Sequence, residues 1–128
     1  MILDAGFLIS VDRGERSARA VVLADDAPQS LHTSHPVVAQ VWRDGSSQAR
    51  LAAFLKHITV HPFDDGPAVG RLLARSGTSD VVDAHLVVLA ARLDKDILTA
   101  DPTDLKTISD SLGSSGPTIR PWPGHGTE

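Results

Sequence analysis

Short apolar runs recur along the chain, separated by stretches in which apolar residues lie three or four positions apart. The runs 1–3, 58–61 and 96–99 are apolar or β-branched and too short for helices, which predicts buried strands. Residues 30–33 and 118–120 are weaker strand candidates, and the second of them suits the edge of a sheet.

Helices are predicted between these strands. They cover 5–11, 16–23, a segment from Ser34 to a break at 45–47, 48–57, 67–75, 80–93 and 103–112. We expect Ser34 to cap the third helix, and Thr78 or Ser79 to cap the helix that begins at Asp80. Strands that alternate with helices predict βαβ units, and therefore an α/β fold with a mostly parallel sheet.

Length and composition predict one domain. The 128 residues suggest a domain over 1–121 and a flexible tail over 122–128, which is rich in proline and glycine. The absence of cysteine excludes disulfides, zinc-thiolate sites and cysteine nucleophiles. We expect a cytoplasmic protein, because the chain shows neither a signal peptide nor an apolar stretch long enough to span a membrane. The formal net charge of −4 does not favour a general nucleic-acid-binding surface.

Aspartates follow two of the predicted strands and open one of the predicted helices. Asp4 follows the first strand and Asp101 follows the strand at 96–99, so both are expected at the edge where the carboxyl ends of parallel strands meet. Asp80 and Asp83 are three residues apart and share one face of a helical first turn. Aspartate is also a common helix cap, and that role is the open alternative for Asp80 in particular.

Carboxylates crowded in this way repel one another, and such a cluster either takes up protons or binds a cation. Oxygen ligands without histidine or cysteine favour Mg²⁺ or Mn²⁺. The sequence therefore predicts a divalent metal ion held by Asp4, Asp83 and Asp101.

Four segments of the chain form one pattern: 3–9 (LDAGFLI), 38–43 (VAQVWR), 77–84 (GTSDVVDA) and 98–105 (LTADPTDL). Together they resemble the PIN domain, and specifically the VapC-type ribonuclease toxins of bacterial toxin–antitoxin pairs. Their order and spacing cover roughly residues 1–121. The resemblance implies a three-layer α/β/α sandwich with a mostly parallel sheet of four to five strands. It also implies Mg²⁺- or Mn²⁺-dependent hydrolysis of RNA, a homodimer and a cognate antitoxin protein.

The resemblance also assigns roles to single residues. Asp4, Asp83 and Asp101 match acidic positions of the family, and Thr99 matches a hydroxyl residue beside the last of them. The remaining acidic position falls on Gln40, which can offer a carbonyl oxygen but no negative charge. Asp80 could restore part of that charge.

Arginines near the predicted site are candidates for RNA contacts, and we single out Arg13 and Arg43 as residues that could hold phosphates. The alternative is a catalytically weakened PIN-like module that acts only through a protein partner, and Gln40 favours it.

Two other α/β classes fit less well. A phosphoryl-accepting receiver domain needs a lysine after its last strand, and none of Lys56, Lys95 and Lys106 occupies such a place. A dinucleotide-binding fold needs a G-x-G-x-x-G segment after the first strand, which the chain lacks.

Overall fold

A five-stranded sheet forms the centre of this computed structural model, which describes residues 1–24 and 30–123. The strand order is β3-β2-β1-β4-β5, and every neighbouring pair is parallel. The strands are β1 (Ile2–Leu3), β2 (His32–Ser34), β3 (Thr59–His61), β4 (Ile97–Thr99) and β5 (Ile119–Pro121). The predicted α/β class and mostly parallel sheet are confirmed, and the strand predicted at 118–120 lies at an edge.

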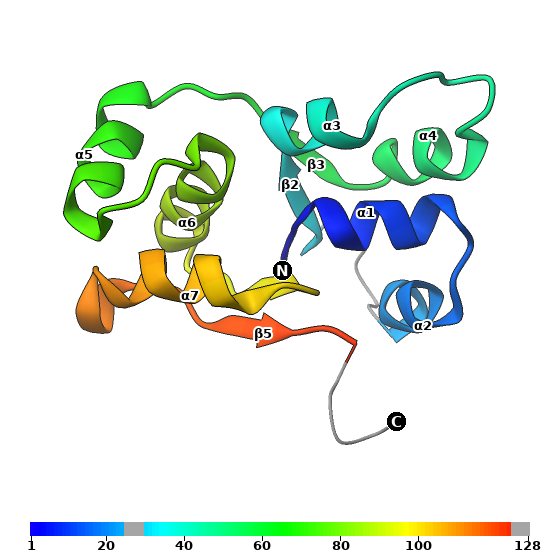
Figure 1. The fold of residues 1–128 in the computed structure, drawn as a ribbon. Coiled ribbons are helices and arrows are strands. Elements are labelled where there is room, and N and C mark those ends of the chain that lie inside the picture. Colours follow the sequence, from blue (N-terminus) through cyan, green and yellow to red (C-terminus); the bar gives the residue numbers. More distant parts are fainter. Residues whose placement is uncertain (25–29, 124–128) are drawn as a thin grey trace.

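Helices cover both faces of this sheet, which gives the three-layer sandwich (Figure 1). The first group is α1 (Ala5–Asp12), α2 (Arg16–Ala24), α3 (His35–Val41) and α4 (Ala49–Leu55). The second group is α5 (Gly66–Ser76), α6 (Val81–Leu93) and α7 (Pro102–Asp110), followed by the short 3₁₀ helix η2 (Gly113–Ser115). Helix α1 packs against α2, α3 and α4, whereas α6 packs against α5 and α7.

Side chains at the helix starts explain where α3 and α6 begin. Ser34 caps α3 as predicted, because its hydroxyl accepts the backbone N–H of Val37 at 3.2 Å. The prediction that Thr78 or Ser79 caps α6 is wrong. Asp80 is the cap, and its carboxylate accepts the backbone N–H of Asp83 at 3.0 Å. The hydroxyl of Thr78 instead lies 2.8 Å from that of Ser76.

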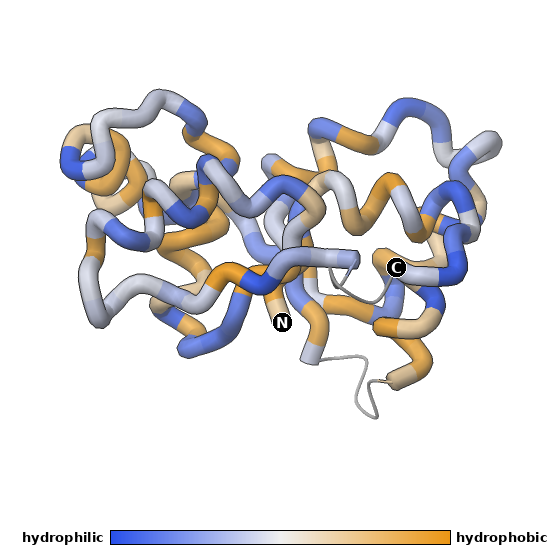
Figure 2. Tube along the Cα trace, turned by 60° about the horizontal axis from the view of Figure 1, so that its bottom comes forward, coloured by the Kyte–Doolittle hydropathy of each residue, from blue (hydrophilic) through white to orange (hydrophobic). Residues whose placement is uncertain are grey.

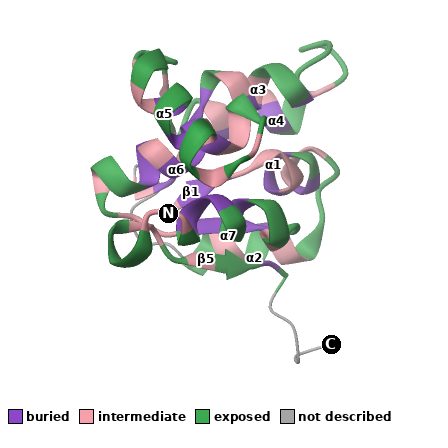
Figure 3. Ribbon diagram, turned by 60° about the vertical axis from the view of Figure 1, so that its left-hand side comes forward, coloured by how far each residue is buried: buried purple, intermediate pink, exposed green. Residues whose placement is uncertain are grey.

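The central strands supply the middle of the hydrophobic core. Ile2, Leu3 and Ile97 are fully buried, as expected for parallel strands covered on both faces. Figure 3 shows buried positions along β1 and on the inner sides of the helices, whereas the outer helix surfaces are exposed. The hydropathy pattern in Figure 2 follows the same division, with apolar positions alternating with polar ones along the helices.

The packed core includes the residue that follows the predicted end of the domain at residue 121. Trp122, predicted to begin a flexible tail, is only 6% exposed, and its ring centroid lies 5.0 Å from that of Phe7. Its backbone N–H donates to the carbonyl of Thr99 at 2.7 Å, which continues the pairing of β5 with β4. The prolines and glycine next to Trp122 suggest a break in the sequence, whereas the tryptophan itself packs in the core. Residues 124–128 of the predicted tail lie outside the described part of the chain.

None of the described helices combines the length and the apolar character needed to cross a membrane.

Candidate active site

A cleft of about 210 Å³ opens at the carboxyl ends of β1 and β4. It is lined by Asp4, Ala5, Gly6, Val37, Gln40, Asp83, Leu86, Ala100, Asp101 and Leu105. The predicted metal-binding aspartates therefore line one cleft, although they come from three distant segments of the chain. We call this hollow the acid cleft.

Asp4 is held in place by hydrogen bonds from two directions. It lies at the end of β1 and caps α1, where its Oδ1 accepts the backbone N–H of Phe7 at 3.1 Å. Its Oδ2 accepts the hydroxyl hydrogen of Thr99. Burial raises the pKa of Asp4 above its ordinary value; the two hydrogen bonds oppose this shift, and the charge of Asp101 adds to it.

The charges of four other aspartates act on the pKa of Asp83. It is half-buried in the first turn of α6, and burial is the main cause that raises its pKa to about 6. The charges of Asp80 and Asp104 raise this pKa further, followed by smaller contributions from Asp4 and Asp101. A cation in the acid cleft would relieve this repulsion.

Asp101 occupies the N-cap position of α7, but its carboxylate makes no capping hydrogen bond. Its backbone N–H donates to the hydroxyl oxygen of Thr99 at 3.0 Å, which orients the turn after β4. The carboxylate is therefore available to the acid cleft that it lines.

Several residues predicted for the site lie outside the lining of the acid cleft. Asp80 is exposed and caps α6, so it acts on the cleft through its charge on Asp83. Thr99 is fully buried and acts through Asp4. Arg43 donates from its guanidinium to the carbonyl oxygens of Ala39 and Trp42, at 3.3 and 2.7 Å.

Arg13 and Asp104 also lie outside the lining of the acid cleft. Arg13 is the C-cap of α1, at the far end of the helix that Asp4 begins. Asp104 resembles an ordinary first-turn charge of α7 in the sequence, but in the structure its charge raises the pKa of Asp83. Its position three residues after Asp101 was the available signal, since both residues then lie near the start of the same helix.

The donor chemistry of the acid cleft fits a hard divalent cation, because it offers carboxylate oxygens and the amide oxygen of Gln40. The described residues do not contain three histidine, cysteine, aspartate or glutamate side chains grouped closely enough to hold a metal ion together. The cleft therefore offers oxygen ligands of the kind that a hard cation prefers, but its described side chains are not grouped closely enough to surround an ion.

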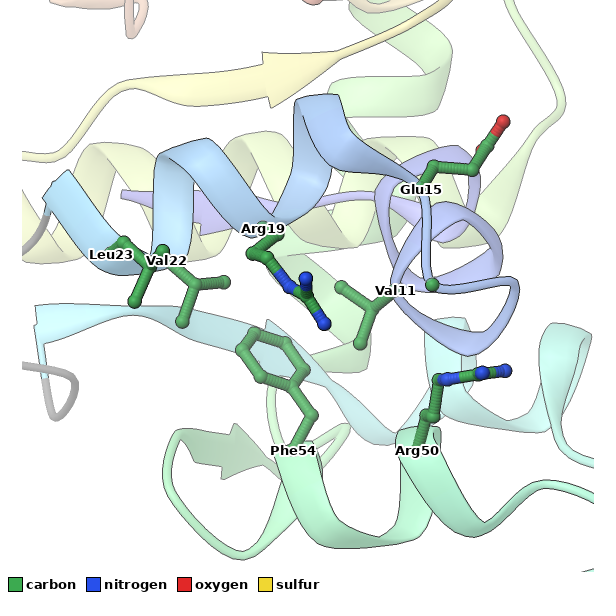
Figure 4. A pocket seen from close by; sticks show the side chains of 8 residues that line it. Val11, Glu15, Arg19, Val22, Leu23, Arg50 and Phe54 are labelled. Carbon is green, nitrogen blue, oxygen red and sulfur yellow. The ribbon is translucent and has the colours of Figure 1, made fainter.

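A second hollow of about 270 Å³ lies between α1, α2 and α4 (Figure 4). Its walls are Val11, Gly14, Glu15, Arg19, Val22, Leu23, Arg50 and Phe54, none of which lines the acid cleft. Leu23 is 76% exposed at the rim of this hollow. We call this surface the α1–α2–α4 groove.

No protein-family model matches this chain, and no curated protein matches it. Solved structures do match it. A toxin–antitoxin complex from Klebsiella pneumoniae contains a chain with 18% identity and a TM-score of 0.67, over 80% of this chain and 88% of that one. VapBC2 from Rickettsia felis, bound to a promoter DNA fragment, gives 14% identity and a TM-score of 0.67 over 94% and 97% of the two chains.

FitAcB from Neisseria gonorrhoeae gives 14% identity and a TM-score of 0.62, over 93% of this chain and 95% of that one. At such identities the likeness concerns the fold. The predicted PIN-like three-layer sandwich is thereby confirmed.

Proposed function

We propose that this protein is the metal-dependent ribonuclease toxin of a toxin–antitoxin pair. The observation that supports the proposal is the acid cleft, which is lined by Asp4 and Asp101 at the carboxyl ends of β1 and β4 and by Asp83 in the first turn of α6. The matched chain from Klebsiella pneumoniae belongs to a toxin–antitoxin complex, and the match to VapBC2 agrees with the resemblance to VapC-type toxins, which supports the same class.

In this proposal Asp4, Asp83 and Asp101 hold Mg²⁺ or Mn²⁺. A bound ion would supply positive charge beside the scissile phosphate and would favour ionisation of the attacking water. The hydrogen bond from Thr99 keeps Asp4 oriented, and the free carboxylate of Asp101 faces the cleft. A carboxylate of the cleft would take the proton of the attacking water. Without a metal ion, burial and the neighbouring carboxylates raise the pKa of Asp83 to about 6, and a bound cation would favour its ionised form. Hydrolysis then joins the water oxygen to phosphorus and breaks one phosphodiester P–O bond.

The antitoxin is proposed to be a cytoplasmic protein partner with an acidic and apolar segment, and the toxin itself is proposed to form a homodimer. The α1–α2–α4 groove supports the antitoxin proposal, because Arg19 and Arg50 flank apolar walls formed by Val22 and Phe54 (Figure 4).

A purified-protein assay tests the ribonuclease activity directly. Asp101→Asn removes a carboxylate that makes no capping bond, and Asp4→Asn keeps an oxygen that can still accept from Phe7. We expect RNA cleavage by the wild type with Mn²⁺ but not with EDTA. Each variant should lower the rate on the order of a hundredfold.

Asp110→Asn serves as the control, since it removes an exposed carboxylate at the end of α7 and away from the acid cleft. Growth arrest and RNA cleavage on induced expression in a bacterial host, lost with Asp4→Asn, would extend the result to cells. Intact RNA with every variant and the wild type would contradict the proposal.

The second candidate is a catalytically weakened PIN-like module that acts through its partner. Gln40 favours it, because the acid cleft carries an uncharged amide where a fourth carboxylate would strengthen metal binding. Calorimetry separates the two functions. A nuclease should bind Mn²⁺ in a manner that Asp83→Asn weakens, whereas a metal-free module should show no such binding.

A further inference from the structure

Gln40 is the only side chain in the lining of the acid cleft that carries N–H donors. The other polar side chains of the lining are Asp4, Asp83 and Asp101, and the remaining lining residues are glycine or apolar. Ionised carboxylates accept hydrogen bonds but donate none. The cleft therefore has one side chain that can donate a hydrogen bond to an anion.

The amide of Gln40 is exposed, and no group in the described part of the chain forms a hydrogen bond with it. Gln48 shows what a structural glutamine does in this fold. Its Oε1 accepts the backbone N–H groups of Arg43 and Asp44 at 2.7 and 2.9 Å. Its Nε2 donates to Val41 and Asp12, at 2.9 and 3.3 Å. The amide of Gln40 makes no such hydrogen bonds within the described part of the chain and is therefore available to bind a ligand.

Helix α3 also gives Gln40 a fixed position. Ser34 caps the helix, and Val37, one turn before Gln40, is 1% exposed in the core and also lines the acid cleft. A donor on an anchored helix loses little conformational freedom of the backbone when it binds.

We propose that Gln40 is an RNA-binding residue, and that its Nε2 donates to a non-bridging oxygen of a phosphate in the acid cleft. The inference rests on the proposed ribonuclease function. It states that the amide of Gln40 binds the RNA substrate. A carboxylate at this place could only accept, and it would repel the phosphate. In the competing role, the carbonyl oxygen of Gln40 would coordinate a metal ion.

Three variants separate these roles. Gln40→Met keeps the length of the side chain and removes the donor. Gln40→Glu also removes the donor and adds a negative charge. Ala39→Glu adds the same charge at the neighbouring exposed position of α3, which does not line the cleft, and is the matched control.

The measurements are KM and kcat on a short RNA, binding of that RNA with Ca²⁺ by fluorescence anisotropy, and Mn²⁺ binding by calorimetry. For Gln40→Met we expect RNA binding to weaken and KM to rise about tenfold, as befits one hydrogen bond to a charged group. The kcat and the Mn²⁺ affinity should stay within about twofold. Gln40→Glu should weaken RNA binding at least as much, and Ala39→Glu should not.

Wild-type RNA binding by Gln40→Met would overturn the inference. A parallel loss of Mn²⁺ affinity in that variant would also overturn it, since it would identify the carbonyl as a metal ligand. If the wild type binds RNA without cleaving it, the ribonuclease proposal fails and the binding measurements alone decide the role of Gln40. If the wild type binds no RNA, both proposals fail.

Discussion

Thr99 donates its hydroxyl hydrogen to Oδ2 of Asp4, and the same hydroxyl oxygen accepts the backbone N–H of Asp101 at 3.0 Å. One buried side chain on β4 thus fixes the carboxylate that ends β1 and the turn that presents the next carboxylate. Burial raises the pKa of Asp4, whereas the hydrogen bond from Thr99 lowers it and favours the ionised form that a metal needs.

Replacing Thr99 by valine should therefore weaken both the fold and the acid cleft. The buried hydroxyl and its two hydrogen bonds are lost, so we expect the free energy of unfolding to fall by about 1–3 kcal/mol. Mn²⁺ affinity should fall about tenfold, as for loss of a group that orients a metal ligand. Urea denaturation and calorimetry measure the two effects. Thr99→Ser keeps the hydroxyl and should retain most of the Mn²⁺ affinity; equal losses in both variants would contradict the role of the hydroxyl.

The raised pKa of Asp83 predicts that this residue destabilises the metal-free protein at neutral pH. Its pKa of about 6 exceeds the ordinary 3.8, so the folded state holds the proton more tightly than the unfolded state between these values. Stability contributed by Asp83 is therefore present in acid and is lost as the pH rises through about 6. In EDTA at pH 7.5, Asp83→Asn should stabilise the protein by about 1 kcal/mol, a value reduced for the screening of a half-buried group.

Thermal denaturation at pH 7.5 and near pH 4 tests this prediction. The stabilisation by Asp83→Asn should disappear at the lower pH, because wild-type Asp83 is then protonated. Mn²⁺ should raise the melting temperature of the wild type and not that of the variant. Asp110→Asn removes an exposed carboxylate outside the cleft, and the same stabilisation in that control would show that general charge repulsion is responsible.

Local sequence features predicted the sheet, because each strand depends mainly on its own residues. The apolar run at Ile2 and Leu3 is sufficient to indicate a buried parallel strand, and the aspartate that follows it is then at the carboxyl end. The start of α6 was less certain, since Ser79 and Asp80 are adjacent and both are good caps. Only the backbone conformation distinguishes them.

Tertiary contacts determine the parts of the site that the sequence did not predict. The charge of Asp104 affects Asp83 because α7 packs beside α6, and no local pattern contains that contact. The direction of a long side chain is equally non-local. The sequence gives Arg43 a charge near the site, whereas the structure turns its guanidinium towards carbonyls of its own helix end.

The two tryptophans should differ in their importance for stability. Trp122 is 6% exposed and packs on Phe7, whereas Trp42 is 36% exposed at the end of α3. We expect Trp122→Ala to lower the free energy of unfolding by about 3–5 kcal/mol, because it leaves a cavity in the core. Trp42→Ala should cost less than half as much. Urea denaturation of both variants is the measurement, and equal costs would contradict the assignment of Trp122 to the folded domain.

A histidine pair joins the outer two strands on one side of the sheet. Nδ1 of His32 on β2 lies 2.9 Å from Nε2 of His61 on the edge strand β3, and the rings stack at an angle of 24°. One of these nitrogens must donate and the other must accept, so the pair cannot carry two protonated rings and keep this hydrogen bond.

Charges on the neighbouring elements reinforce this preference for neutral rings. Burial is the main cause that lowers the pKa of His32 to about 4, and His61, Lys95 and the N-terminal amine add to the shift. Burial also lowers the pKa of His61, with a contribution from Arg92 that Asp64 opposes.

Acid should therefore loosen the β2–β3 edge. Because the pKa of His32 is depressed in the folded state, its contribution to stability is complete above the ordinary value of 6.5 and is lost as the pH falls towards about 4. Between these values the wild type should lose about 1 kcal/mol more than His32→Asn, which cannot titrate, after allowance for the partial exposure of the pair. Urea denaturation at pH 7 and pH 4.5 measures the difference. His57→Gln alters an exposed histidine outside the pair and should lose as much stability between the two pH values as the wild type. If His32→Asn also loses as much as the wild type, the stacked pair does not control the acid response.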